Sequence, residues 1–158
     1  MSTPEIGIRE ATVADRAALE ALNLELQAVE REIRASRALP EAIAAPFTDK
    51  QLGRLGDPDY SVLVAEAGGR VIGYITCGIG KDSLEALPRE ATIEDLVIEQ
   101  GSRGRGVARR LVARAEAFAR ERGAHRLFVS HLVGNAAAGA AYDALGFVPS
   151  LVTVEKPL

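Results

Sequence analysis

The sequence predicts an α/β (α+β) fold in which helices cover a mixed β-sheet, and two sets of observations carry this prediction. Runs of apolar and β-branched residues at 60–66, 70–77 and 93–98 are typical of strands. Two longer segments, 12–34 and 107–122, repeat apolar residues at helical spacing. With the shorter elements between them, the expected order is β-α-α-β-β-β-α-β-α-β. Such an order favours a sheet layered against helices.

The N-terminal part is expected to form one strand, at 6–9, and then a helix that runs to about Arg34. Thr12 is suited to cap this helix, with Asp15 at the capping-box position. The next stretch is irregular, and residues 35–58 form either a surface connection or a wall of an acceptor site.

Two prolines, Pro40 and Pro46, are expected to break the chain within that stretch. Thr48 is then expected to cap a short helix that ends near Leu55.

The rest of the chain is expected to form the sheet centre and its second helical layer. Gly68 and Gly69 form the turn of a hairpin, and Gly123 ends the long helix as a C′ residue. The remaining elements are a loop at 80–90, the central strand 93–98, a strand at 126–131, a helix from Asn135 to Leu145 and a last strand at 151–155.

Composition bounds the function. The 158 residues fit a single domain, 1–158, and are 47% hydrophobic and 26% charged, as in soluble globular proteins. A net charge of −3 argues against a nucleic-acid partner, and no apolar run approaches the roughly 20 residues that cross a membrane. The single Cys77 excludes an intramolecular disulfide and a cysteine-based zinc site. The sequence shows no secretory signal pattern, so a cytoplasmic location is expected. No bound metal is expected.

A glycine-rich segment joins the central strand to the long helix, and this arrangement predicts a phosphate site. Glycines allow close approach of the backbone, and a helix N-terminus offers free N–H groups. A Walker loop is excluded because no Gly-Lys-Ser/Thr triplet exists. A dinucleotide fingerprint starting at Gly104 would place Arg109 where the third glycine belongs. The pattern that remains is Arg103-x-x-Gly106-x-Ala108.

This loop resembles the Arg/Gln-x-x-Gly-x-Gly/Ala loop of the GNAT superfamily of N-acetyltransferases, which holds the diphosphate of acetyl-coenzyme A. A second element, Asn135-x-x-Ala138-x-x-x-Tyr142-x-x-x-Gly146-Phe147, resembles the one after the family's fifth strand. Tyr74 also fits the family's third strand, so the resemblance covers residues 60–157. It implies a GNAT fold, with a mixed sheet splayed between its fourth and fifth strands and flanked by about four helices.

The resemblance implies an enzyme that transfers an acetyl group from acetyl-CoA to a primary amine of a small molecule or peptide by direct attack. In the family, the coenzyme's pantetheine arm pairs with the fourth strand at the splay, and an N–H at Val97 or Ile98 is suited to stabilise the oxyanion. Asn135 is either a helix cap or a ligand contact. The coenzyme-binding residues carried over are Leu96, Val97, Ile98, Arg103, Gly104, Arg105, Gly106, Val107, Ala108, Asn135, Ala138 and Tyr142.

Acid and base roles follow from the same resemblance. Tyr142 is expected to protonate the departing thiolate, since a tyrosine pKa near ~10 nearly matches a thiol pKa near ~8.5. Glu94 is expected to act as a base, directly or through water, or else to form a salt bridge at the rim. Strand alternation is expected to point Glu94 and Asp95 to opposite faces. His131 is a second candidate base or a structural histidine.

Other possibilities stay open at this point. A GNAT-fold module that binds coenzyme A or a ligand without turnover, as a sensor or partner subunit, is the main alternative, and a nucleotide binder is a weaker one. Glu25 and Glu32 share a helix face that either meets a cationic acceptor or is plain solvated surface. A homodimer is expected, with the strand 151–155 as a possible edge.

Overall fold

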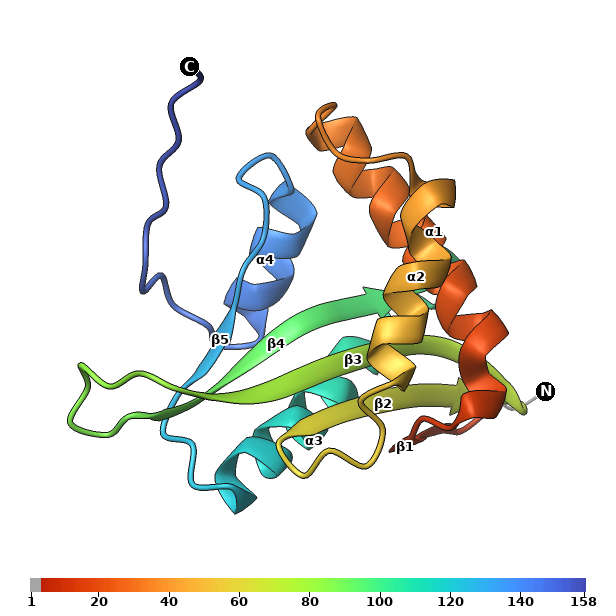
Figure 1. Cartoon of the computed structure of the whole chain (residues 1–158). Coiled ribbons are helices and arrows are strands. Elements are labelled where there is room, and N and C mark those ends of the chain that lie inside the picture. Colours follow the sequence, from red (N-terminus) through yellow and green to blue (C-terminus); the bar gives the residue numbers. More distant parts are fainter. Residues whose placement is uncertain (1–3) are drawn as a thin grey trace.

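The computed structural model describes residues 4–158 and contains a five-stranded mixed sheet (Figure 1). The strands lie in the order β1-β2-β3-β4-β5; the first four are antiparallel neighbours and β5 is parallel to β4. The strands are β1 Ile6–Glu10, β2 Tyr60–Ala67, β3 Arg70–Lys81, β4 Arg89–Ile98 and β5 Leu127–Val129.

Helices cover both faces of this sheet. The first two lie on one face and α3 lies on the other, while α4 follows β5 beyond the splay (Figure 1). The helices are α1 Arg16–Ile33, α2 Pro40–Leu52, α3 Val107–Glu121 and α4 Ala136–Ala144, with short 3-10 turns at Val13–Asp15 and Gln100–Ser102. Among residues 4–158, no helix combines the length and apolar character that a membrane crossing requires.

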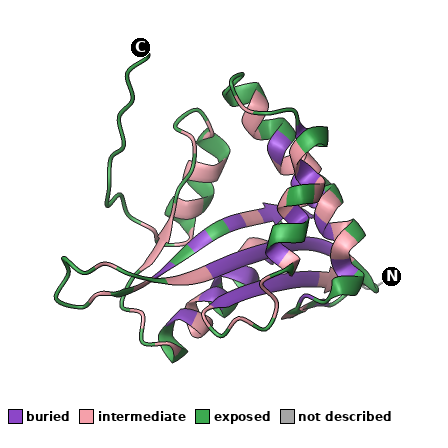
Figure 2. Cartoon of the chain, viewed as in Figure 1, coloured by how far each residue is buried: buried purple, intermediate pink, exposed green. Residues whose placement is uncertain are grey.

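Two hydrophobic cores lie on the two faces of the sheet (Figure 2). On the α3 face, Leu111 and Ala115 pack on Ile75 and Ile93, and all four side chains are almost fully buried. On the face of α1, Leu19 and Leu22 pack on apolar side chains of β2, β3 and β4. The predicted amphipathic character of both long helices is thus confirmed.

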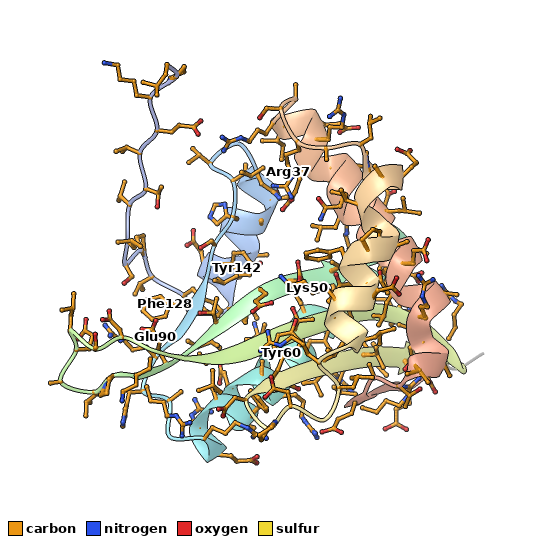
Figure 3. All side chains as sticks on the ribbon, in the orientation of Figure 1. Arg37, Lys50, Tyr60, Glu90, Phe128 and Tyr142 are labelled. Atoms are coloured by element: carbon orange, nitrogen blue, oxygen red, sulfur yellow. The ribbon has the colours of Figure 1, made fainter. Side chains whose placement is uncertain are left out.

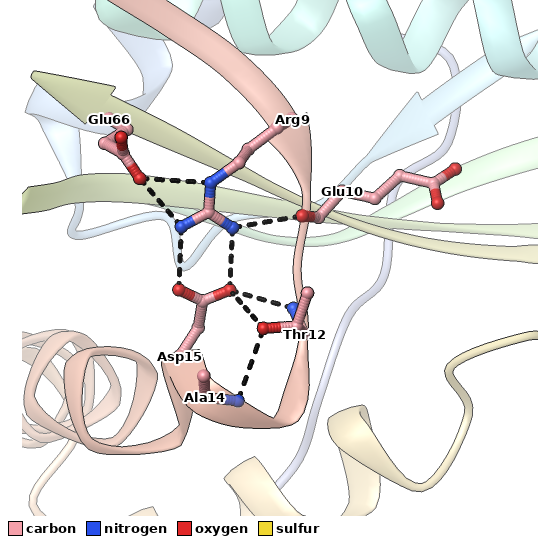
Figure 4. A network of polar contacts seen from close by, with 6 residues as sticks. All are labelled: Arg9, Glu10, Thr12, Ala14, Asp15 and Glu66. Carbon is pink, nitrogen blue, oxygen red and sulfur yellow. Dashed lines mark hydrogen bonds and ion pairs between the residues drawn. The ribbon is translucent and has the colours of Figure 1, made fainter. Parts of the chain in front are cut away.

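A polar network fixes the entry into α1 (Figure 4). The guanidinium of Arg9 on β1 donates to both oxygens of Asp15, at 2.8 and 2.9 Å, and to Glu66 on β2. The predicted capping box is present, since Thr12 accepts from Ala14 N–H and its own N–H donates to Asp15. Hydrogen bonds from Arg9 are the main reason why the pKa of Asp15 is lowered.

The predictions of chain breaks at Pro40 and Pro46 and of a helix cap at Thr48 were wrong. One helix, α2, begins with Pro40 at its first turn, where proline's missing N–H costs nothing, and continues through Pro46. Thr48 lies inside this helix instead of capping it, and its hydroxyl donates to the carbonyl of Ala44 at 2.9 Å. Contacts of Thr48 and Gln51 with the buried Asn23 of α1 hold the helix across the proline.

Several strand boundaries differ from the predicted ones, and the pairing between neighbouring strands explains the differences. The Gly68–Gly69 hairpin turn is confirmed, both glycines having positive φ. Strands β3 and β4 stay paired as far as Lys81 and Arg89, so both strands are longer than predicted. The loop expected at 80–90 is therefore limited to 82–88. The strand expected at 151–155 is absent, because residues 149–158 pair with no strand.

The sheet splays between β4 and β5. Their pairing covers three residues of each strand, Ala91–Ile93 against Leu127–Val129, although β4 continues to Ile98. Beyond Ile93, β4 is paired with β3 alone. The splay predicted between the fourth and fifth strands is confirmed.

Candidate active site

The turn between β4 and α3 is open and rich in free amides. Gly104 and Gly106 have φ of +75° and +77°, and a Cβ on either would meet no atom within 4 Å. The first N–H bonded into α3 is that of Arg110, to the carbonyl of Gly106 at 3.2 Å. The amides of Val107 and Ala108 therefore precede the helical hydrogen bonds and stay available at the positive end of the helix. This geometry can hold an anion such as a diphosphate.

The guanidinium of Arg103 has a structural role in this turn. It donates to the carbonyl of Ile98 at 3.1 Å and to Glu25 of α1 at 3.1 Å. Arg103 thus ties the end of β4 to α1 across the mouth of the splay. The exposed Arg105 lies one residue away from Gly106 in the same turn.

The open edge of β4 presents main-chain groups of alternate residues. The N–H of Glu99 donates to Ile72 of β3 at 3.0 Å, whereas the carbonyl of Ile98 accepts from Arg103. Because main-chain direction alternates along a strand, Ile98 and Leu96 face the splay and Val97 faces β3. These are the groups to which an extended ligand could add as a further strand.

A bulge in β4 brings two carboxylates to the same face of the sheet. Thr76 of β3 pairs with Asp95, but the next residue, Cys77, pairs with Ile93, so Glu94 is the extra residue. Ile93 and Leu96 consequently both belong to the α3 core although they are three residues apart. Glu94 and Asp95 both contact side chains on the opposite face, so the predicted opposite orientation was wrong.

Glu94 lies at the rim of that face. Its Oε2 accepts from the hydroxyl of Tyr60 at 3.2 Å, and its Oε1 lies 3.5 Å from Arg54. The Arg54 guanidinium also stacks 3.5 Å above the ring of Tyr60. The rim salt bridge that was the alternative for Glu94 is therefore present.

Asp95 is buried, and no cationic side chain of residues 4–158 lies within hydrogen-bonding distance of it. Its Oδ2 accepts from Thr76 Oγ1 at 3.0 Å and from Gln51 Nε2 at 3.1 Å. Its Oδ1 accepts no hydrogen bond from the described residues, and this oxygen is not fully buried, so it keeps access to solvent. Burial raises the pKa of this carboxyl from 3.8 to about 6.

The surroundings of Asp95 form a buried polar cluster that joins α1, α2 and β3. Asn23 donates to Thr48 at 2.7 Å and to Gln51 at 3.0 Å, and it accepts from the hydroxyl of Tyr74. Each member is satisfied within the cluster, which therefore fixes the side chain of Gln51 against Asp95.

Tyr142 lies on α4 (Figure 3). Its ring centroid is 5.9 Å from that of His131 and 5.6 Å from that of Phe147. Burial raises the pKa of its phenol, and the negative charges of Asp95 and Glu30 raise it further. Asn135 caps α4 by accepting from Ala138 N–H at 3.1 Å. The structure thus places Asp95, Glu30 and Tyr142 within electrostatic reach of one another.

The remaining candidates have simple surroundings. Glu25 is paired with Arg103, and Glu32 is exposed. His131 lies against α4, beside Gly139. Cys77 is a buried hydrophobe whose pKa burial raises to about 12, and residues 4–158 contain no cluster of side chains suited to a metal ion.

Sequence reasoning placed Asp95 on the central strand but preferred Glu94 as the candidate base. For Asp95 a signal existed: the apolar residues of β4 shift from positions 91 and 93 to 96 and 98 across two adjacent acids. Such a shift of phase is what a bulge produces. Nothing in the sequence singles out Glu30 from the other acids of α1.

Comparison with known proteins agrees with this geometry. The model of the acetyltransferase (GNAT) family matches residues 25–147, which is more than half of the chain. The chain therefore belongs to the GNAT family of acetyltransferases. Streptothricin acetyltransferase of Streptomyces lavendulae is 41% identical over 70 residues, which span 44% of this chain and 37% of that relative.

Solved structures share the fold. A mutant of the BH1408 protein from Bacillus halodurans matches with a TM-score of 0.82 and 21% identity, covering 96% of this chain and 99% of that one. A GCN5-related N-acetyltransferase from Ralstonia eutropha JMP134 gives 0.75 and 24%, covering 98% and 99%. The aminoglycoside N-acetyltransferase AAC(6')-Iy in complex with CoA gives 0.74 and 17%, covering 99% and 97%.

Proposed function

We propose that this chain, as a single domain of residues 1–158, is an acetyl-CoA-dependent N-acetyltransferase that acts on a small-molecule or peptide amine. The observation that carries the proposal is the continuous donor surface formed by the open edge of β4 and the free amides before α3. That surface has the length and polarity for an extended arm ending in a diphosphate. The relative solved with CoA supports the choice of coenzyme.

Different residues of this surface bind different parts of the coenzyme. The amides of Gly104 to Ala108 bind the diphosphate, helped by the positive charge of Arg105. The main chain of Leu96 and Ile98 pairs with the pantetheine arm. The N–H of Ile98 is the better placed oxyanion donor, because Val97 faces β3.

Acetyl transfer then needs two proton movements. The amine nitrogen attacks the thioester carbonyl, the carbon–sulfur bond breaks, and the thiolate takes the phenolic proton of Tyr142. The raised pKa of Tyr142 keeps the phenol protonated at neutral pH and increases the difference from the pKa of the thiol. Tyr142 therefore contributes at the modest end of general acid catalysis.

The base that takes the proton of the amine belongs to the carboxylate pair on β4. Glu94 is one candidate, but Arg54 and Tyr60 already satisfy it. Asp95 supports the role better, because it has an unbonded oxygen and no cationic partner. With its pKa raised to about 6, Asp95 is ionised yet basic at neutral pH.

The acceptor is an amine that carries further positive charge. On the face covered by α1 and α2, Asp95 contributes a carboxylate with neutral partners, whereas Glu94 is paired with Arg54 and Glu30 with Arg37 at 2.5 Å. Helix α2 forms part of the wall there. By name, the relatives acetylate streptothricin and aminoglycosides, which are small molecules. Both observations favour a small polycationic acceptor.

An amine-panel assay that follows release of free coenzyme A thiol tests this function. A set of aminoglycosides, streptothricin, polyamines and short peptides is expected to contain an acceptor that raises thiol release above the rate without amine. Mass spectrometry then identifies the acetylated nitrogen. Tight coenzyme binding with no turnover on any amine would instead favour the binding-module alternative.

A further inference from the structure

The hydrogen bonds of the buried polar cluster between α1, α2 and the sheet run in one direction. The hydroxyl of Thr48 gives its one proton to the carbonyl of Ala44 at 2.9 Å. Its oxygen can therefore only accept, and it accepts from Nδ2 of Asn23 at 2.7 Å. The same nitrogen donates to Oε1 of Gln51 at 3.0 Å. A main-chain carbonyl thus determines which way the amide of Gln51 lies.

The other end of that amide faces the sheet. Nε2 of Gln51 donates to the hydroxyl of Tyr74 at 3.3 Å and to Oδ2 of Asp95 at 3.1 Å. Tyr74 gives its own proton to Oδ1 of Asn23. Asn23, Gln51 and Tyr74 therefore form a closed ring in which each side chain donates to one neighbour and accepts from the other. Turning Gln51 over would break this ring and bring its oxygen against the carboxyl group of Asp95.

This arrangement suits an ionised carboxyl group at residue 95. Thr76 also donates to Oδ2, at 3.0 Å, so this oxygen receives two hydrogen bonds. Hydrogen bonds donated to a carboxylate favour its charged form and offset part of the cost of burial. Oδ1 receives none from the described residues and keeps access to solvent. The protein thus occupies one oxygen of Asp95 and leaves the other open.

The charged and titratable groups around Asp95 oppose its ionisation. Burial is the main reason why its pKa is raised, and the charges of Glu94 and Glu30 add to this effect. Arg54 and Arg37 are paired with these two glutamates. Three phenols face the same carboxyl group, and burial together with its charge raises the pKa of each: Tyr60, Tyr74 and Tyr142. The hydrogen bonds to Oδ2 are therefore what favours the carboxylate here.

We propose that Gln51 and Thr76 are positioning residues, which bind Oδ2 of Asp95 and leave Oδ1 to take the proton of the acceptor amine. Asp95 acts as the base in the function proposed above, on which this inference rests. The N–H bond of the ammonium breaks, its proton forms a bond to Oδ1, and the nitrogen keeps the electron pair that attacks the thioester carbon. Because the ring with Asn23 holds Gln51 in place, the packing of α2 on α1 acquires a role in the reaction.

Gln51→Glu tests this role, because it keeps the size of the side chain and the acceptor for Asn23 but removes the donor to Asp95. Asp95 should then be protonated at higher pH, so the pH below which kcat/KM falls should rise by about one unit or more. Below that pH the change is a loss of about tenfold, and the loss should shrink as the pH is raised. A variant that is merely destabilised would lose activity at every pH.

Gln27→Glu is the matched control, since Gln27 is the other buried glutamine of the helices α1 and α2. Its Oε1 accepts from Arg37 at 2.9 Å, so the new carboxylate would face a cation instead of Asp95. The pH below which kcat/KM falls is expected to stay near that of the wild type. Thr76→Val removes the other donor to Oδ2 with little change of shape. It should shift the profile in the same direction as Gln51→Glu, and it provides the test if circular dichroism shows that Gln51→Glu does not fold.

Carbon-13 NMR of the carboxyl groups follows the protonation of Asp95 without any acetyl transfer, with its signal identified by its absence from Asp95→Asn. The midpoint is expected to rise in Gln51→Glu and in Thr76→Val, and to stay in place in Gln27→Glu. Unchanged midpoints in the first two variants would overturn the proposal, as would a raised midpoint with an unchanged pH profile of kcat/KM. A raised midpoint in a protein that acetylates no amine would support the hydrogen bonds to Oδ2 and place the failure in the proposed function.

Discussion

Replacing Asp95 with asparagine removes the one carboxyl group of the candidate site that is buried without a cationic partner within hydrogen-bonding distance. Asparagine keeps the size and can still accept from Thr76 and Gln51, so the fold is expected to survive. The protonation of residue 95 is then eliminated from both the folded and the unfolded state. The difference between wild type and variant therefore isolates the titration of Asp95.

The sign follows from the direction of the shift. The folded pKa of Asp95 is raised from 3.8 to about 6. Below pH ~4 the carboxyl is protonated in both states, and its contribution to stability is fully present. Between pH ~4 and ~6 the unfolded chain ionises while the folded chain resists, so this contribution is lost. A shift of about two units corresponds to roughly 3 kcal/mol.

Urea unfolding of both proteins at several values between pH 4 and 8 measures this. The stability of wild type relative to Asp95→Asn is expected to fall by up to about 3 kcal/mol across that range. Other carboxyl groups, such as Asp15 and Glu99, titrate in both proteins and cancel. Glu94→Gln, at the exposed rim, is the control and should show no comparable trend. A constant difference between wild type and Asp95→Asn would refute the burial argument.

Three further predictions concern single side chains. Tyr142→Phe is expected to keep coenzyme binding and lower turnover by roughly 10- to 10²-fold; an unchanged turnover rate would remove Tyr142 from the mechanism. Gly73→Ala is expected to destabilise the fold by about 1–3 kcal/mol, because its Cβ would lie 2.7 Å from the carbonyl oxygen of Val97, whereas Gly7→Ala, with free space, should cost far less in the same urea titration. Asn23→Ala leaves Gln51 and the hydroxyl of Tyr74 short of partners and is expected to cost about 2–4 kcal/mol; equal midpoints in urea would contradict the cluster described above.

The glycine-rich turn before α3 was predictable because its signals are local. The spacing from Arg103 to Ala108 determines a turn, and positive φ at Gly104 and Gly106 is a property that glycine alone supplies easily. The splay likewise follows from a family pattern that two separate motifs support. These features depend little on the rest of the chain.

The face covered by α1 and α2 was less predictable because it depends on packing between distant residues. Helix α2 continues through Pro46, and its residues Thr48 and Gln51 accept hydrogen bonds from Asn23 on α1, a contact between distant residues that no local pattern announces. The bulge that turns Asp95 toward α2 is set by pairing with β3, so alternation within β4 gave the wrong face.

The C-terminal strand shows a different limit of sequence reasoning. The pattern of residues 150–156 is that of a strand, yet a strand forms only where an edge is available to pair with it. Within one copy, no edge receives this segment.

The most direct test of the account is a calorimetric titration of coenzyme A into the wild-type chain, into Gly106→Val and into Gly101→Ala. All three proteins should fold, and Gly101→Ala is the matched control, since it adds a Cβ in open space at a glycine of the same turn without positive φ. The account predicts micromolar binding by wild type and by Gly101→Ala, and loss of binding by Gly106→Val, because valine strongly disfavours the φ of +77° that aligns the amides. No binding by wild type, equal binding of NAD, or full binding by Gly106→Val would contradict it.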